Sequence, residues 1–358
     1  MSRVIVGMSG GVDSAVAAYL LKEAGYEVRG VTLRTWLSLD GTESRCCEID
    51  DARRVAQKLN IPYHPQNCSL DFEKYIIDAF IQDYIDGVTP NPCVICNKLI
   101  KWDRLIYTAD IMKADYIATG HYANVVKNEN GRYTLKKADD ATKDQTYMLY
   151  RLTQEQLART IMPLGNMTKS QVRNIAVDAG LKIAHKPDSQ EICFVTQGTY
   201  ADFIHENAKK PVPGVGNFVD ENGKILGKHK GIINYTVGQR KGLGLSLGYP
   251  AYVKYIDSDK NEVVLGTEKS IYSKKIICRD LNFLSIDRLK ASEYLNAIVK
   301  VRYHHQGQLG VVHMIDDDRA EIIFEEGVKA AARGQSAVFY DEQDCVIGGG
   351  IIDQVIYD

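Results

Sequence analysis

Short apolar runs alternate with helix-period apolar positions through roughly the first 120 residues. The run from Val4 to Met8 is typical of a buried parallel strand, and the helical pattern that follows it ends at Gly25. Further strands are predicted at residues 27–33, 61–64 and 115–119, with helices at 49–59, 72–84 and 99–109. Because strands that alternate with helices form parallel sheets, this half of the chain is predicted to be a doubly wound α/β domain.

The pattern changes after Ala208, where prolines and glycines between Pro211 and Gly216 predict a linker into a glycine-rich β region. Short strands are then predicted at residues 276–277, 297–303, 310–315, 320–324, 336–340 and 350–356. Such a series is typical of a small barrel or sandwich. The expected domains are a parallel-sheet nucleotide-binding domain (1–208), a small β-rich central domain (209–270) and a C-terminal β-barrel (271–358).

Short motifs predict several local elements. Asn130-Gly131 indicates a hairpin between Val125 and Leu135, and Asn222-Gly223 and Ser258-Asp259 are typical of hairpin turns in the later β region. Thr168 followed by Gln171 has the spacing of a capping box, in which each residue satisfies a backbone N–H at the start of a helix.

Composition indicates an ordinary globular protein with 45% apolar and 25% charged residues. The net charge of −2 gives no bulk attraction to a polyanion, so nucleic-acid binding needs a local basic face. One stretch, residues 222–256, lacks Asp and Glu and contains Lys224, Lys228, Lys230, Arg240, Lys241 and Lys254. A cytoplasmic protein is expected, because no signal-peptide pattern or membrane-spanning run is evident, and its eight cysteines are then expected to be reduced.

The turn from Ser9 to Ser14, S-G-G-V-D-S, lies between the first predicted strand and helix. Backbone N–H groups and the helix dipole favour a phosphate there. The turn lacks the lysine of the Walker pattern, so it fits a pyrophosphate that leaves, and Asp13 suits an anion site only with Mg²⁺ between them. The ligand is expected beyond the carboxyl ends of the strands, where Gly7 to Ser14, Leu33 and Gly120 gather.

Two polar segments carry candidate thiols. Asn91 can cap a helix that starts at Pro92, which puts Cys93 and Cys96 in a first turn that favours thiolate; Cys193 lies in a second polar loop. The residues alone allow a redox pair, a metal or iron–sulfur site completed by Cys193 or Cys46, a pair of working thiols (Cys96 and Cys193), or incidental buried cysteines. Cys68, Cys278 and Cys345 are interpreted as structural.

The S-G-G-V-D-S turn resembles the loop of the ATP pyrophosphatase (PP-loop) superfamily. Together with T-P-N-P-x-x-x-C-N-K near residue 90, T-G-H-Y at 119–122, K-D-Q at 143–145, I-C-F at 192–194 and V-R-Y at 301–303, it resembles the tRNA-specific 2-thiouridylase family over nearly the whole chain.

This resemblance implies an enzyme that adenylates the 2-oxygen of the wobble uridine in tRNA and replaces it with sulfur. ATP would be bound by Gly7, Met8, Ser9, Gly10, Gly11, Val12, Asp13, Ser14, Leu33 and Gly120, with Mg²⁺. Cys193 would carry a persulfide, and Cys96 would be the nucleophile that releases the sulfur by forming a disulfide with Cys193.

The resemblance also implies the RNA contacts and the partners. Asn91, Pro92 and Cys93 would lie against the target base, and Lys143, Asp144, Gln145, Arg302 and Tyr303 would contact the tRNA. The β domains would hold the anticodon arm. Sulfur would come from a cysteine desulfurase or a sulfur-relay protein, no membrane is involved, and a monomer is expected.

Cys93 departs from the family pattern, because many members have Asp at this position. A thiolate set of Cys93, Cys96 and Cys193 would suit an iron–sulfur cluster, which is an alternative route to the same product. Two further alternatives are another PP-loop adenylating synthetase, which would not need these cysteines, and a tRNA-binding or iron–sulfur module without catalysis.

Overall fold

The computed structural model describes residues 1–38, 41, 44, 47–187 and 192–357. The chain divides into two compact units. Unit 1 comprises Met1–Ile77, Cys93–Gly198 and Gln343–Val346, and unit 2 comprises Asp78–Pro92, Thr199–Glu342 and Ile347–Asp358. The predicted domain bounds at 208 and 270 stay predictions.

Unit 1 is built on a five-stranded sheet in the order β3-β2-β1-β4-β7, with every pair parallel. The strands are β1 (Arg3–Gly7), β2 (Glu27–Arg34), β3 (Tyr63–Asn67), β4 (Tyr116–Ala118) and β7 (Thr160–Ile161). This confirms the predicted parallel sheet. The strand order reverses between β1 and β4, and ligands of such sheets bind beyond the strand ends at this point.

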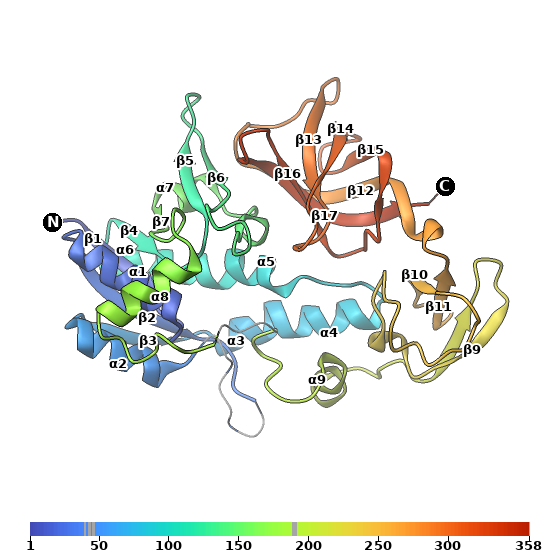
Figure 1. The fold of residues 1–358 in the computed structure, drawn as a ribbon, viewed down its shortest axis with the longest axis horizontal. Helices are drawn as coiled ribbons and strands as arrows, with labels where there is room; N and C mark the ends of the chain where they lie inside the picture. Colours follow the sequence, from blue (N-terminus) through green and yellow to red (C-terminus); the bar gives the residue numbers. More distant parts are fainter. Residues whose placement is uncertain (39–40, 42–43, 45–46, 188–191, 358) are drawn as a thin grey trace. The chain divides into compact units, whose positions relative to one another are not determined.

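Helices α1 (Val12–Glu23), α2 (Ile49–Leu59) and α8 (Lys169–Asp178) lie beside the sheet (Figure 1). Each contributes buried apolar side chains to the core that contains β1. Gly25 caps the C-terminus of α1 as predicted, and its φ of +86° places it in the left-handed region. The N–H of Gly25 donates to the Lys22 carbonyl oxygen and that of Tyr26 to the Leu21 carbonyl oxygen, which is the Schellman arrangement.

The predicted helices at 72–84 and 99–109 are parts of longer helical runs that contain π-helical turns. The first run is α3 (Ser69–Phe72), η1 (Glu73–Ile77) and α4 (Asp78–Ile85), and the second is α5 (Pro92–Cys96), η2 (Asn97–Trp102) and α6 (Asp103–Ile111). Both η1 and η2 are π-helical, with one residue more per hydrogen-bonded ring than an α-helix. A search for 3.6-residue periodicity does not separate these turns from the α-helix around them.

The strand predicted at 61–64 is shifted in the structure to Tyr63–Asn67 (β3). It is the edge strand next to β2, and it is only partly buried. The apolar run that motivated the prediction therefore marks the approach to the strand, because an edge strand does not need a continuous apolar sequence.

Two local predictions in unit 1 are confirmed. The hairpin consists of β5 (Asn124–Lys127) and β6 (Tyr133–Lys136), with Gly131 at φ +82° in its turn. In α8 the Thr168 hydroxyl accepts the Gln171 N–H at 3.3 Å, while the Gln171 side chain accepts the Thr168 N–H at 2.7 Å. Short helices η3 (Thr146–Met148) and α7 (Gln154–Ala158) complete this part.

Thr168→Ala is expected to lower the free energy of unfolding by about 1 kcal/mol, because the N-terminal N–H groups of α8 lose an acceptor. Chemical denaturation of the variant measures this loss. Thr168→Ser keeps the hydroxyl and is the control, so an equal loss in both variants would show that capping is not the cause.

Unit 2 contains α4, α9 (Tyr200–Asn207), a four-stranded sheet and a closed barrel. The sheet order is β10-β11-β8-β9, from β8 (Gly216–Val219), β9 (Ile225–His229), β10 (Tyr252–Asp257) and β11 (Glu262–Gly266). The predicted turns at 222–223 and 258–259 lie in its antiparallel connections. Short helices η4 (Ile232–Asn234) and η5 (Lys269–Ile271) flank β10 and β11.

The C-terminal strands close into a barrel in the order β12-β15-β14-β13-β16-β17, which decides between the predicted barrel and sandwich. They are β12 (Tyr272–Phe283), β13 (Tyr294–Lys300), β14 (Gln308–Met314), β15 (Ala320–Lys329), β16 (Ser336–Tyr340) and β17 (Val346–Ile356). Phe324 and Phe339 are fully buried in its core. Every helix in the described part of the chain is too short or too polar to cross a lipid bilayer.

Candidate functional site

The loop between β1 and α1 is closed by hydrogen bonds of its own hydroxyl groups. The N–H of Ser9 donates to the Ser14 hydroxyl at 3.1 Å, and the N–H of Gly11 donates to the Ser9 hydroxyl at 3.3 Å. The Ser14 hydroxyl donates to the Gly11 carbonyl oxygen at 3.1 Å. Gly11 is the N-cap of α1 and has no side chain to cover the first helical turn, so the positive end of the helix faces the loop.

Two glycines allow the backbone to pack closely here. Gly10 has a φ of +84°, and a Cβ on it would lie 2.6 Å from the Glu48 carbonyl oxygen. A Cβ on Gly120, which follows β4, would lie 2.6 Å from the Asp13 carbonyl carbon and from the Ser14 nitrogen. The segment after β4 therefore meets the first turn of α1 backbone to backbone, at the point where the strand order reverses.

The predicted ATP-binding residues gather at this edge of the sheet. Gly7 ends β1, and Met8 is buried behind the loop with its carbonyl oxygen accepting the Thr32 hydroxyl at 2.6 Å. Leu33 lies near the end of β2, and its carbonyl oxygen accepts the Cys47 thiol at 3.1 Å. The structure thus brings together Gly7, Met8, Ser9, Gly10, Gly11, Val12, Asp13, Ser14, Leu33 and Gly120, and their contacts with ATP stay predictions.

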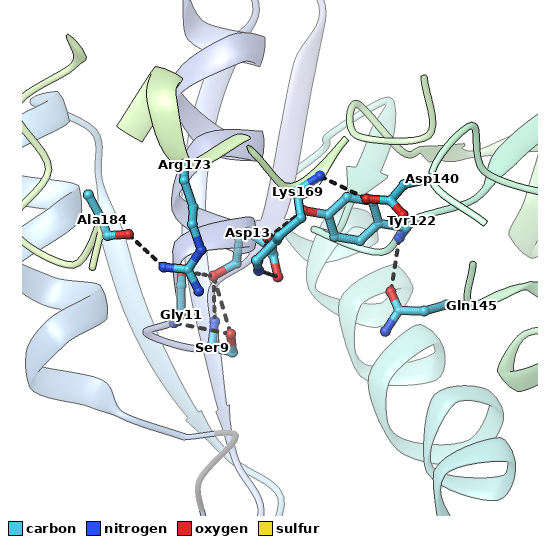
Figure 2. A network of polar contacts seen from close by, with 10 residues as sticks. Ser9, Gly11, Asp13, Tyr122, Asp140, Gln145, Lys169, Arg173 and Ala184 are labelled. Carbon is cyan, nitrogen blue, oxygen red and sulfur yellow. Dashed lines mark hydrogen bonds and ion pairs between the residues drawn. The ribbon is translucent and has the colours of Figure 1, made fainter. Parts of the chain in front are cut away.

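Asp13 is the centre of a polar network drawn in Figure 2. Its carboxylate accepts hydrogen bonds from the Lys169 ammonium group at 2.7 and 2.8 Å, and from the Tyr122 hydroxyl at 2.8 Å. The Lys169 side chain is only 12% exposed. An ion pair this sheltered is screened less by salt than a surface pair.

Lys169 and Arg173 are site residues that the sequence did not reveal. Lys169 is the first residue of α8, and the Asp140 carboxylate accepts its backbone N–H at 3.0 Å. Arg173, one turn further along α8, donates to the Ala184 carbonyl oxygen at 2.8 Å, and Figure 2 shows its guanidinium group directed toward the loop. The capping box at Thr168 is the sequence signal that could have identified Lys169. It places this lysine at the start of a helix, where the helix dipole disfavours a positive charge.

The K-D-Q segment is joined to this network through Tyr122. The Gln145 side chain accepts the Tyr122 N–H at 2.9 Å, and the Gln145 N–H donates to the Tyr122 carbonyl oxygen at 2.9 Å. Asp144 is buried and accepts the N–H groups of Ala138 and Thr146. Its carboxylate therefore orders the segment from inside, while Lys143 is half-buried, and the tRNA contacts of all three residues stay predictions.

His121 belongs to the T-G-H-Y segment and directly precedes Tyr122. Its Nδ1 is 2.9 Å from the Thr119 hydroxyl, and its ring centroid is 5.4 Å from that of the buried Trp102. Burial, and secondarily the charge of Lys101, hold the pKa of His121 well below its usual value, so the ring is neutral at physiological pH.

Helix α5 begins at Pro92, as predicted, and contains both thiols of the T-P-N-P motif. Cys96 is buried, Cys93 is exposed, Pro92 is buried and Asn91 is half-buried. Asn91 and Pro92 belong to unit 2 and the two cysteines to unit 1, so the predicted target-base residues straddle the division between the units.

The helical run is held to the K-D-Q side of unit 1 directly after Cys96. Asn97 is buried, and its side-chain amide donates to the Met148 carbonyl oxygen at 3.0 Å. The Trp102 indole N–H donates to the Thr160 hydroxyl at 2.8 Å at the other end of η2. These two bonds hold the predicted nucleophile on a firmly anchored helix.

Cys193 is half-buried, and its neighbour Phe194 anchors the loop. The Phe194 ring is fully buried and packs edge-on against Phe72, with 5.8 Å between the centroids. The Thr196 hydroxyl lies 3.1 Å from that of Ser38. Residues 188–191 of the same segment lie outside the described residues.

No disulfide joins Cys96 and Cys193 in this structure, and the disulfide predicted between them stays a prediction. Within the described ranges, no three His, Cys, Asp or Glu side chains are grouped so that they could hold a metal. Cys46, one candidate for a third thiolate, lies outside those ranges.

Arg302 and Tyr303 lie in unit 2, just beyond the end of β13 at Lys300. The Arg302 guanidinium donates to the Lys329 carbonyl oxygen at 2.8 Å, and the Tyr303 ring packs edge-on against His304 at 4.8 Å. Burial, with the charge of Arg302, lowers the pKa of His305 to about 4, so this segment gains no charge from that ring near neutral pH.

Family models match the chain in three successive parts. A tRNA methyl transferase HUP domain matches residues 2–197, a tRNA methyl transferase PRC-barrel domain matches 201–267, and an aminomethyltransferase β-barrel domain matches 273–352. The first covers the parallel sheet with its loop, and the third covers most of the closed barrel.

Two relatives that match over nearly their full length are both tRNA-specific 2-thiouridylases. The tRNA-specific 2-thiouridylase MnmA of Lachnoclostridium phytofermentans is 49% identical over 360 residues, which cover 98% of this chain and 99% of that protein. The tRNA-specific 2-thiouridylase MnmA of Acetivibrio thermocellus is 50% identical over 358 residues, with 98% and 99% covered. Among solved structures, the U34-tRNA thiolase NcsA from Methanococcus maripaludis with its [4Fe-4S] cluster is 22% identical, covers 57% of this chain and 63% of that one, and has a TM-score of 0.35, which is too low to inform the chemistry here.

The names of the domain families refer to methyl or aminomethyl transfer, whereas the relatives are 2-thiouridylases, which transfer sulfur. The relatives decide between them, because they match at about half identity from end to end. With its PP-loop at the strand-order reversal and its T-P-N-P and I-C-F cysteines, the chain belongs to the tRNA-specific 2-thiouridylase family.

Proposed function

We propose that this chain is an ATP-dependent sulfurtransferase that adenylates the 2-oxygen of the wobble uridine in tRNA and replaces it with sulfur. The observation that carries the proposal is that unit 1 holds both a PP-loop at the reversal of strand order and the two cysteines Cys96 and Cys193. A synthetase that only adenylates its substrate would need the loop and not the thiols.

ATP is proposed to bind at the Ser9–Ser14 loop with Mg²⁺. The donors fit this ion, because Mg²⁺ is usually held by one or two carboxylates together with substrate phosphates, rather than by a cage of protein ligands. Asp13 supplies one carboxylate beside the loop, and the described residues include no larger group of ligating side chains. The ion neutralises phosphate charge, while Ser9, Ser14 and the N-terminus of α1 orient the phosphates.

The chemistry follows from the poor leaving ability of the uridine 2-oxygen. Attack of this oxygen on the α-phosphorus of ATP releases pyrophosphate and forms an adenylated base. Attack of sulfur at C2 then expels AMP, which carries the oxygen away. The base must be splayed out of its stack to reach the site, as in recognition of single-stranded RNA in general.

The proposed sulfur source is a persulfide on Cys193. Once the terminal sulfur is bonded to C2, attack of the Cys96 thiolate on the Cys193 sulfur breaks the S–S bond, leaves the sulfur on the base and forms the Cys96–Cys193 disulfide. The sulfane sulfur is reduced as the two thiols are oxidised, so an external thiol reductant must open the disulfide before the next turnover. Cys193 is half-buried rather than enclosed, which supports loading by a cysteine desulfurase or a sulfur-relay protein.

The tRNA is proposed to contact Asn91, Pro92 and Cys93 at the target base, and Lys143, Asp144, Gln145, Arg302 and Tyr303 elsewhere. The basic stretch of unit 2 also supports RNA binding, because five of its six basic side chains are exposed: Lys224, Lys228, Lys230, Arg240 and Lys241. The sixth, Lys254, is paired with Glu221. The chain is proposed to act as a cytoplasmic monomer.

Lys228→Ala is expected to weaken tRNA binding and to lower the slope of log K against log salt by about one, because one phosphate contact and its released counterion are lost. Filter binding over a range of salt concentrations measures the slope. Lys254→Ala removes a lysine that already has a carboxylate partner and should leave the slope unchanged. A slope equal to that of the unaltered protein in Lys228→Ala would exclude this residue from the RNA interface.

An iron–sulfur route is the second candidate, because Cys93 adds a third thiol to Cys96 and Cys193, although these three side chains are not grouped as a metal site in this structure. A cluster held by three thiolates would leave one iron open to bind the incoming sulfur. Protein purified without oxygen that contains neither iron nor sulfide, and is still fully active, would exclude this route.

The proposed function is tested by incubating the protein with unmodified tRNA, ATP, Mg²⁺, cysteine and a cysteine desulfurase, and then analysing the nucleosides by mass spectrometry. Formation of 2-thiouridine that requires ATP and is accompanied by AMP and pyrophosphate is expected. Release of AMP without sulfur incorporation, under reducing conditions, would point to another adenylating synthetase.

A further inference from the structure

The ion pair between Lys169 and Asp13 suggests how the loop obtains the positive charge that its own sequence lacks. We propose that Lys169 is the phosphate-binding lysine of this site. When ATP or free pyrophosphate binds, the ammonium group of Lys169 exchanges its contact with Asp13 for contacts with the β- and γ-phosphates of ATP or with the pyrophosphate. The proposal deepens the proposed function, since it assigns a role in ATP binding to a residue outside the loop.

The position of the ammonium group is unusual for a lysine whose only role is structural. It lies beside the first turn of α1, where the helix dipole carries its positive end and repels a cation. The Asp13 carboxylate offsets this repulsion with bonds of 2.7 and 2.8 Å to the ammonium group. A polyphosphate would offset it better, because it brings several negative oxygens to the same place.

Two backbone N–H groups in the first turn of α8 have side-chain acceptors without a ligand. The Asp140 carboxylate accepts the backbone N–H of Lys169, and the Thr168 hydroxyl accepts that of Gln171. These bonds position the start of the helix and leave the side chain of Lys169 as the group that α8 directs at the loop. Asp140 is therefore a positioning residue for the lysine.

A second cation stands one turn along the same face of α8. Residues four apart in a helix share a face, so Arg173 and Lys169 are neighbours there. The bond from Arg173 to the Ala184 carbonyl oxygen holds its guanidinium group on the loop side, as Figure 2 shows. Two positive side chains and the end of α1 therefore meet at one loop, which suits a ligand that carries more than one negative charge.

Asp13 keeps a partner when the lysine moves to phosphate. The Tyr122 hydroxyl donates to the same carboxylate at 2.8 Å, and Tyr122 is fixed by its two backbone bonds with Gln145. The exchange therefore frees one side of the carboxylate for the Mg²⁺ that accompanies ATP, and leaves the other side tied to the K-D-Q segment.

The experiment compares the binding of ATP, pyrophosphate and AMP by calorimetry, with Mg²⁺ and without tRNA. Lys169→Met keeps the apolar stem of the side chain and removes the charge. It is expected to weaken binding of ATP and pyrophosphate by about 10- to 100-fold, because a charge-assisted contact is lost. AMP, which lacks the β- and γ-phosphates, should bind within about twofold of its usual affinity, and Lys169→Arg should recover part of the ATP affinity.

Lys137→Met is the matched control. Lys137 pairs with Asp344 at 2.6 Å and is 24% exposed, and its partner lies on a different segment from the loop. ATP affinity should not change in this variant. Equal losses for ATP and AMP in Lys169→Met, or no loss for ATP, would overturn the proposal, and an unchanged melting temperature confirms that the variants are folded. The measurement needs neither tRNA nor sulfur, so failure of the wild-type protein to thiolate tRNA would reject the proposed function and leave this result standing.

Discussion

Cys96→Ser is expected to reduce tRNA thiolation by a factor on the order of 10⁴ or more, the scale on which enzymes lose activity when a covalent nucleophile is removed. A serine hydroxyl cannot attack the Cys193 sulfur, because it is neither ionised at neutral pH nor able to form a disulfide. ATP binding should be unchanged, since Cys96 lies on α5 while the phosphate loop joins β1 and α1. Quantifying 2-thiouridine beside calorimetric ATP binding measures both effects.

Cys193→Ser separates the two assigned roles. It should prevent loading of radioactive sulfur from a desulfurase, whereas Cys96→Ser should retain the label because its persulfide carrier is intact. Cys345→Ser is the matched control, since Cys345 is a half-buried cysteine of unit 1 that is interpreted as structural. Thiolation that survives Cys96→Ser would remove Cys96 from the mechanism.

Gly120→Ala is expected to weaken ATP binding about 100-fold and to lower the free energy of unfolding by about 1–3 kcal/mol, the usual range for overpacking. The added Cβ would lie 2.6 Å from the Asp13 carbonyl carbon and the Ser14 nitrogen, both of which are backbone atoms. Backbone cannot turn away as a side chain can, so the start of α1 must move, and with it the hydroxyl and carboxylate of the loop. Calorimetry and chemical denaturation measure the two losses.

The control for this substitution is Gly214→Ala, because a Cβ on Gly214 meets no atom within 4 Å. Neither ATP affinity nor stability should change in that variant. If Gly120→Ala bound ATP normally, the close packing of the segment after β4 against the first turn of α1 would not be required for the site.

The features that were predicted correctly are formed by residues that lie close together in the sequence. The strand–loop–helix unit at Ser9–Ser14, the helix end at Gly25, the hairpin at Gly131 and the capping box at Thr168 each depend on hydrogen bonds or patterns that span a few residues. Alternation of such units also indicated the parallel sheet. The structure then brings the predicted ATP-binding residues to one edge of that sheet.

Features that depend on distant partners escaped this reasoning. The π-helical turns after Phe72 and Cys96 interrupt periodic patterns that look uniform, and β3 begins later than its apolar run because an edge strand tolerates polar residues. The segment Gln343–Val346 joins unit 1 although its neighbours in the chain belong to unit 2, and no local pattern marks that exchange.

The sequence by itself determined the loop, the helix starts and the cysteines that carry the proposed chemistry, because these need only neighbouring residues. The tertiary structure alone decided what surrounds Asp13: Lys169 lies 156 residues away in the chain and Tyr122 lies 109 away. The physical reason is that packing α8 against α1 and pairing β4 with β1 closes long loops and selects partners by shape and charge in three dimensions, and spacing along the chain does not encode that selection.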